Sequence, residues 1–129
     1  MTEKSINTPY DLMGGESAVL NLVDRFYFYM DTLPEAQGIR QMHAESLSNA
    51  REKLFKFLSG WLGGPDLFVQ EFGHPMLRRR HLPFAIAQSE SDQWMMCMNK
   101  AMSELEMDEG LKKALLESLD QLANHMINQ

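Results

Sequence analysis

The stretch GHPMLRRRHLPF, residues 73–84, interrupts an otherwise helical sequence and decides how the chain is organised around it. Proline cannot continue a long helix, so a helical turn fits only between Pro75 and His81, and Pro83 prevents its extension. The connector that contains this stretch, residues 65–88, is long for a compact domain and carries apolar and aromatic side chains. We therefore expect the functional site to lie in this region.

Four segments on either side show the spacing of apolar residues that is typical of amphipathic helices. We expect helices over 16–32, over about 47–62, from about residue 89, and from the capping residue Asp108 onward. Their predicted inner faces are Val19, Leu22, Val23, Phe26, Tyr27 and Met30; Ala50, Leu54, Phe57, Leu58 and Trp61; Trp94, Cys97, Met98, Ala101 and Leu105; and Leu111, Leu115, Leu119, Leu122 and Met126.

No strand pattern, internal repeat or low-complexity tract interrupts these segments. The connection between the last two helices is very short, which predicts that they pack antiparallel. The sequence thus predicts a single all-α domain over residues 1–129, with residues 1–8 as a loosely ordered extension.

Composition and charge exclude several classes of protein. The 129 residues carry a net charge of −6, whereas a nucleic-acid binder needs an excess of basic residues for phosphate contacts. The single cysteine, Cys97, rules out an internal disulfide. The first residues resemble no signal peptide and no stretch is long and apolar enough to cross a membrane, so we expect a cytoplasmic protein. The eleven methionines are typical of a soft helical core.

His81 is the first candidate for site chemistry. An imidazole at the end of a short helix is a good axial ligand for haem iron, and Leu77 lies one turn earlier on the same face. Arg78, Arg79 or Arg80 would pair with the carboxylates of such a cofactor. Each feature also has an ordinary explanation, since a lone histidine is often a surface or core residue and an arginine run is often a solvated face.

Other site chemistries find less support. His74 and His81 have no further cysteine or histidine near enough for a structural zinc site. No phosphate-binding loop or nucleophile elbow is present, and Cys97 lies on an apolar helix face, where a structural thiol is expected. Tyr27 and Trp94 fall on inward helix faces, where the Tyr O–H and the Trp N–H need hydrogen-bond acceptors. A neighbouring carbonyl oxygen would meet this need without any ligand.

Taken together, several short pieces resemble group II truncated haemoglobins along nearly the whole chain. The matching pieces are PYDLMGG (9–15), RFY (25–27), REKL (51–54), GWLGGP (60–65), GHP (73–75), RHLPF (80–84), DQW (92–94) and CM (97–98). Each piece is weak alone, but their order and spacing are specific.

The resemblance implies a two-over-two helical sandwich that holds haem b (iron protoporphyrin IX) between the second helix and the short turn that ends at His81. His81 matches the proximal iron ligand. Tyr27 and Trp94 match distal residues that hydrogen-bond the gas ligand, and His43 matches a variable distal position in a helix corner. Ala50 and Leu54 match distal-helix residues nearest the ligand. The implied cofactor contacts are His81, Arg78, Arg80, Leu54, Phe57, Leu58, Leu77, Phe84 and Trp94.

The implied function is reversible binding of dioxygen, carbon monoxide or nitric oxide at pentacoordinate haem, for oxygen storage, transport or sensing. The alternative is a haem-dependent redox enzyme that detoxifies nitric oxide or peroxide with electrons from an external reductase. A cofactor-free helical interaction module is disfavoured. The sequence leaves open whether the protein is a monomer or a dimer, and whether His43 binds iron or only hydrogen-bonds the ligand.

Overall fold

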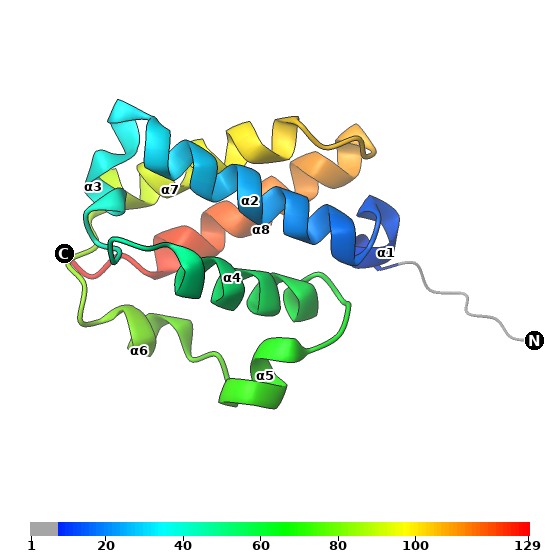
Figure 1. The fold of residues 1–129 in the computed structure, drawn as a ribbon, viewed down its shortest axis with the longest axis horizontal. Helices are drawn as coiled ribbons and strands as arrows, with labels where there is room; N and C mark the ends of the chain where they lie inside the picture. The colour runs from blue at the N-terminus through cyan, green and yellow to red at the C-terminus, as the bar shows by residue number, and fades with distance from the viewer. Residues whose placement is uncertain (1–7) are drawn as a thin grey trace, which may run out of the picture.

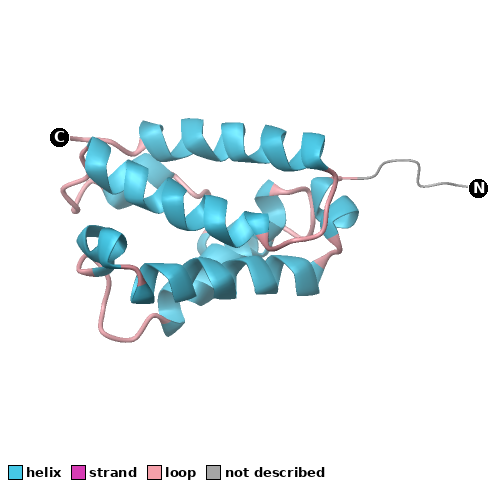
Figure 2. Cartoon of the chain, turned by 90° about the horizontal axis from the view of Figure 1, so that it is seen from above, coloured by secondary structure: helices cyan, strands magenta, loops and turns pink. Residues whose placement is uncertain are grey.

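The computed structural model describes residues 8–129, and every regular element in that range is helical (Figures 1 and 2). The elements are α1 (Pro9–Met13), α2 (Glu16–Thr32), the 3₁₀ turn η1 (Pro34–Ala36), α3 (Gln37–Arg40), α4 (Ser48–Trp61), α5 (Leu67–Phe72), α6 (Leu77–His81), α7 (Gln88–Ser103) and α8 (Glu109–His125).

Four long helices form the two-over-two sandwich. Helix α2 packs against both α7 and α4, and α7 packs against α8. The short connection 104–108 returns the chain so that α8 runs antiparallel to α7, as predicted (Figure 1). Asp108 caps α8, because its side chain accepts a hydrogen bond of 2.9 Å from the N–H of Leu111.

The core lies where α2, α4, α7 and α8 meet. Its largest fully buried side chains include Phe26, Leu22, Met30, Leu58, Met98, Met102 and Leu119. Three of these are methionines, so part of the unusual methionine content serves as flexible core filling. The inner faces predicted for α2 and α7 are therefore largely confirmed, although Trp94 is only half-buried.

The connector before α7 contains one helix more than expected. The predicted turn is present as α6, but residues 67–72 also form a helix, α5. The Phe68 side chain on α5 is buried, and its ring packs at 6.3 Å from that of Phe57 on α4. Tertiary packing of one aromatic side chain thus stabilises a helix too short to show a periodic pattern.

The first helix was also not expected. Thr8 caps α1, since its Oγ1 accepts from the N–H of Asp11 at 3.2 Å, and Pro9 occupies the first helical position. Thr8 therefore belongs to this helix and not to the loosely ordered extension, whose other residues, 1–7, lie outside the described residues. No helix in the described part of the chain is long and apolar enough to cross a membrane.

Candidate functional site

The imidazole of His81 is oriented by the helix that carries it. Its Nδ1 lies 2.6 Å from the main-chain oxygen of Leu77, one turn earlier in α6. A carbonyl oxygen can only accept a hydrogen bond, so Nδ1 carries the proton and donates it. This leaves the lone pair of Nε2 available, and no hydrogen bond to Nε2 occurs among residues 8–129. A histidine that ligates a metal ion through Nε2 needs this arrangement.

Apolar side chains next to His81 are unusually open to solvent. Met76, Leu82 and Phe84 are 50%, 55% and 43% exposed. The Phe84 ring lies 6.5 Å from the imidazole ring. Exposed apolar clusters of this kind mark surfaces that bind a partner or a ligand.

Helix α4 also has an apolar face that is only partly covered. Leu54 and Phe57 are half-buried, whereas Leu58 on the same helix is fully buried in the core. In Figure 1, the chain runs from α4 through α5 to α6. The residues expected to contact the cofactor therefore combine one core residue with several that the protein alone leaves partly uncovered.

Arg78, which was expected to pair with cofactor carboxylates, has main-chain partners in this structure. Its Nη1 donates to the carbonyl oxygens of His125 and Ile127, both at 2.8 Å. The side chain thus joins α6 to the end of α8. Its Nε and Nη2 make no hydrogen bond within residues 8–129, so carboxylate binding by Arg78 stays a prediction.

Arg80 likewise binds the connector before α6. Its Nε donates to the carbonyl of Pro75 at 2.6 Å, and its Nη2 lies 3.2 Å from the carbonyl oxygens of Phe72 and His74. The side chain of Arg79 makes no hydrogen bond or ion pair within the described range. Of the three arginines, Arg79 is therefore the one whose guanidinium has no protein partner there.

Tyr27 is buried on α2, and its hydroxyl reaches helix α4. It donates a long hydrogen bond of 3.4 Å to the main-chain oxygen of Ala50 on α4. Its ring packs edge-on against Phe26 at 4.9 Å. Burial raises the pKa of the Tyr27 phenol well above its usual value, so the group remains a neutral donor.

Trp94 on α7 is brought to the same region through Phe26. The Trp94 and Phe26 rings lie 5.1 Å apart, so Phe26 packs against both Trp94 and Tyr27. No hydrogen bond uses the indole N–H of Trp94 among residues 8–129. Sequence reasoning placed Phe26 only in the core, although its position directly before Tyr27 on the inner face of α2 was a usable signal.

His43 lies in the corner between α3 and α4, close to Tyr27. The two rings are 6.0 Å apart and nearly perpendicular. The His43 Nδ1 donates to the carbonyl of Ile39 at 2.8 Å, which leaves Nε2 as an acceptor. The N–H of Ile39 in turn donates to the Gln93 side chain at 3.0 Å, so this corner is tied to α7 next to Trp94.

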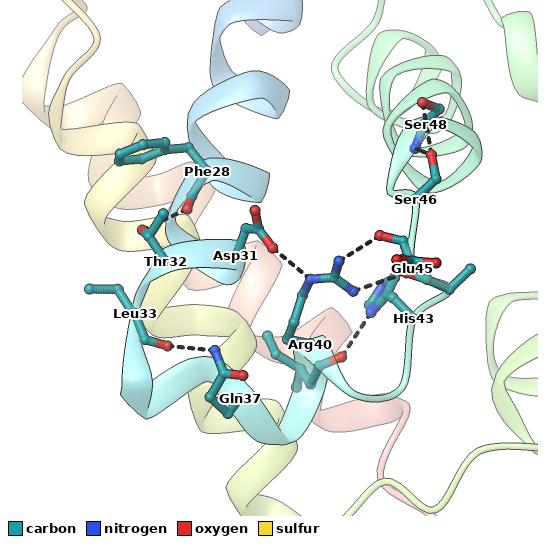
Figure 3. A network of polar contacts seen from close by, with 12 residues as sticks. Phe28, Asp31, Thr32, Leu33, Gln37, Arg40, His43, Glu45, Ser46 and Ser48 are labelled. Atoms are coloured by element: carbon teal, nitrogen blue, oxygen red, sulfur yellow. Dashed lines mark hydrogen bonds and ion pairs between the residues drawn. The ribbon is translucent and has the colours of Figure 1, made fainter.

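Arg40 holds the corner in shape (Figure 3). Its guanidinium donates to Asp31 at 2.8 Å, to the carbonyl of Ala44 at 2.9 Å and to the carbonyl of Glu45 at 2.7 Å. Three bonds from one side chain fix the loop that carries His43. The sequence contained no signal for this role of Arg40, because two of its acceptors are main-chain atoms.

Cys97 takes no part in the site. Its side chain is fully buried on α7, and burial raises the pKa of the thiol to about 11. A protonated thiol is a poor nucleophile, as expected for a structural cysteine. Within residues 8–129, no group of three or more histidine, cysteine, aspartate or glutamate residues could hold a metal ion.

Comparison with known proteins gives a consistent relationship over the whole described chain. The model of the bacterial-like globin family matches residues 8–128. The chain is 37% identical over 126 residues to the group 2 truncated hemoglobin YjbI of Bacillus subtilis, covering 98% of this chain and 92% of that protein.

Solved structures agree with it in fold and sequence. The cold-adapted truncated hemoglobin of the Antarctic marine bacterium Pseudoalteromonas haloplanktis is 50% identical, with a TM-score of 0.93 and coverage of 95% of this chain and 99% of that one. The group II 2-on-2 hemoglobin of Agrobacterium tumefaciens is 41% identical, with a TM-score of 0.95 and 99% of both chains covered. The chain therefore belongs to the group II truncated haemoglobins of the bacterial-like globin family.

Proposed function

We propose that this globin binds haem b through Nε2 of His81 and reversibly binds dioxygen, and also carbon monoxide and nitric oxide, on the distal side. The observation that carries the proposal is the 2.6 Å hydrogen bond from His81 Nδ1 to the carbonyl of Leu77. It fixes the tautomer in which Nε2 carries no proton, so that the lone pair of Nε2 is free to bind the iron. Family membership supports haem as the group that this nitrogen binds.

The residues expected to contact the cofactor fit a flat, largely apolar group with charged carboxylates. Leu54, Phe57, Leu77 and Phe84 offer apolar contact area that is partly uncovered in the protein alone. Arg79 offers a guanidinium without a protein partner among the described residues, and guanidinium groups bind carboxylates strongly. When bound, haem supplies an iron centre that binds diatomic gases reversibly.

The distal residues differ in what they can give to a gas molecule. The Trp94 indole is a donor only, and its N–H has no partner among residues 8–129. The Tyr27 hydroxyl is neutral, and its hydrogen bond to the carbonyl of Ala50 is long. A small rotation of the hydroxyl therefore frees it to donate to a gas molecule. Preorganised donors in a buried site stabilise negative charge that develops on dioxygen. Trp94 is accordingly the principal donor in this proposal, with Tyr27 in support.

Loss of the proposed ligand tests the assignment directly. The purified His81→Ala protein should fail to hold haem stably, or should hold it only when imidazole is added to replace the missing ring. Absorption spectra of the ferric, ferrous and carbon monoxide forms measure this. His74→Ala is the matched control, because His74 is exposed and its side chain makes no hydrogen bond in the described structure. Unchanged haem content and an unchanged ferrous spectrum in His81→Ala would overturn the proposal.

A further inference from the structure

The segment that follows α8 lies along the chain that leaves α6. Asn128 is the centre of this contact, because both atoms of its amide and its main chain are used. Its Oδ1 accepts from the N–H of Ile86 at 2.9 Å, and its Nδ2 donates to the carbonyl of Phe84 at 2.9 Å and that of His81 at 3.4 Å. Its main-chain N–H donates to the carbonyl of Ile86 at 2.8 Å.

A second connection is made in the opposite direction. Arg78, within α6, donates two hydrogen bonds to the carbonyls of His125 and Ile127. The end of α8 and the segment after it are thus bonded to α6 on one side and to residues 81–86 on the other. We refer to these bonds of Asn128 and Arg78 together as the clasp.

The clasp is significant because, apart from the bonds of Arg80 to residues 72–75, few contacts hold α6. A helix of five residues is not stable by itself. No other helix in the described chain packs closely along α6, in contrast to the contacts between α2 and α7 or α4 and α5. The position of the His81 backbone therefore depends on hydrogen bonds from outside the helix.

We propose that Asn128 is a positioning residue for His81: through the clasp it holds residues 81–86 so that the imidazole stands where it binds haem iron. This rests on the proposed function, since it assumes that His81 is the ligand. The hydrogen bonds of Asn128 to residues 81–86 are all to main-chain atoms and none is to the imidazole, so Asn128 acts through the main chain. Its amide must donate and accept at once, because it binds carbonyl oxygens with Nδ2 and an N–H with Oδ1.

This double requirement gives a sharp test. Asn128→Asp keeps the size of the side chain and its acceptor, but it places a carboxylate oxygen against the carbonyls of Phe84 and His81. Asn128→Ala removes the three side-chain hydrogen bonds, to Ile86, Phe84 and His81. Asn124→Asp is the matched control, because only Oδ1 of Asn124 is used, accepting from Ser91 at 2.9 Å and Gln88 at 3.3 Å.

Three measurements read out the effect. Amide hydrogen exchange of residues 81–87 in the haem-free protein reports the clasp independently of the cofactor. The iron–histidine stretching band of the ferrous protein and the rate of haem transfer to an apoglobin acceptor report the position of His81. We expect faster exchange, a shifted band and about tenfold faster haem loss in both Asn128 variants, a change equal to about 1.4 kcal/mol, with Asn124→Asp like the unaltered protein.

Two results would overturn the positioning role. One is that both Asn128 variants behave like Asn124→Asp in all three measurements. The other is that exchange accelerates while the stretching band and haem loss stay unchanged, which would make the clasp merely structural. A missing iron–histidine band in the unaltered protein would instead contradict the proposed function, and the positioning role with it.

Discussion

The three side chains proposed for the distal side differ in the hydrogen bonds they can donate. The indole N–H of Trp94 has no acceptor within residues 8–129. The Tyr27 hydroxyl donates a hydrogen bond to the carbonyl of Ala50, and the Nδ1–H of His43 donates one to the carbonyl of Ile39. Neutral His43 can therefore only accept at Nε2. This ranking leads to different expectations for the two residues that can be altered most cleanly.

Replacing Trp94 by phenylalanine keeps an aromatic ring and deletes the donor. We expect dioxygen to dissociate roughly 5- to 30-fold faster, which corresponds to about 1–2 kcal/mol for a hydrogen bond to a charged group. Stopped-flow displacement of dioxygen by carbon monoxide measures the rate. Trp61→Phe on α4 is the control for the same chemical change. An off-rate equal to that of the control would show that the Trp94 N–H does not reach the ligand.

His43 should contribute little as a donor to dioxygen. Its Nδ1–H is already bonded to the carbonyl of Ile39, and Nε2 acts as an acceptor. We therefore expect the dioxygen off-rate of His43→Phe to stay close to that of the unaltered protein, in contrast to Trp94→Phe. Stopped-flow displacement of dioxygen by carbon monoxide measures both rates. An off-rate raised as much in His43→Phe as in Trp94→Phe would show that His43 donates to the ligand.

Helix α4 ends at a turn that depends on very close packing with α1. A Cβ added at Gly64 would lie 2.5 Å from two atoms of the Tyr10 ring, whose main-chain N–H is bonded to Leu62 at 2.9 Å. A ring held in this way cannot move aside without shifting α1. The glycine is therefore required by its neighbour.

We expect Gly64→Ala to lower the free energy of unfolding by roughly 1–3 kcal/mol, as overpacking does in well-packed interiors. Urea unfolding followed by circular dichroism measures it. Gly110→Ala serves as control, because Gly110 lies in the first turn of α8 with its nearest neighbour, Asp108 Oδ2, at 3.1 Å from an added Cβ, and alanine favours a helix more than glycine does. Equal stability of the two variants would contradict the close approach.

The long helices were predictable, whereas the short helices α1 and α5 were not, for a physical reason. Helix α2 shows several turns of apolar periodicity and is followed by Pro34, so the sequence alone sets its extent. Helix α5 has one buried residue, Phe68, and depends on a ring of α4 that is distant in sequence. A pattern needs several turns to be visible, and a helix of six residues does not provide them.

The candidate site divides in the same way. His81 and Leu77 are one turn apart on a predicted helical turn, so their proximity was predictable, although Leu77 also contributes its main-chain oxygen. The partners of Arg78 are carbonyls nearly fifty residues later, and no side-chain pattern marks a carbonyl acceptor. Sequence reasoning thus predicted a candidate site but could not assign each arginine its partner.

The whole molecule should lose stability at alkaline pH. Burial raises the pKa of Cys97 from about 9 to about 11 and also raises that of Tyr27. The unfolded chain therefore releases these protons first, so unfolding becomes progressively easier above about pH 9, by the order of 2 kcal/mol for the thiol. Urea midpoints at pH 7 and 10.5 measure the loss. Cys97→Ala should lose less over this interval, and an equal loss would contradict the role of the thiol.

Helix α6 has no other helix packed closely along it in the described structure, and this affects how the protein would be degraded. Its five residues carry three consecutive exposed arginines, which are the residues after which trypsin cuts, and proteases need a segment that can open locally. Haem bound by His81 would add an anchor to this segment. We expect trypsin to cut the haem-free protein first at residues 78–80 and the haem-loaded protein much more slowly there, as mass spectrometry of the first fragments would reveal. Helix α6 would then be the site at which proteases first cut a chain that lacks its cofactor.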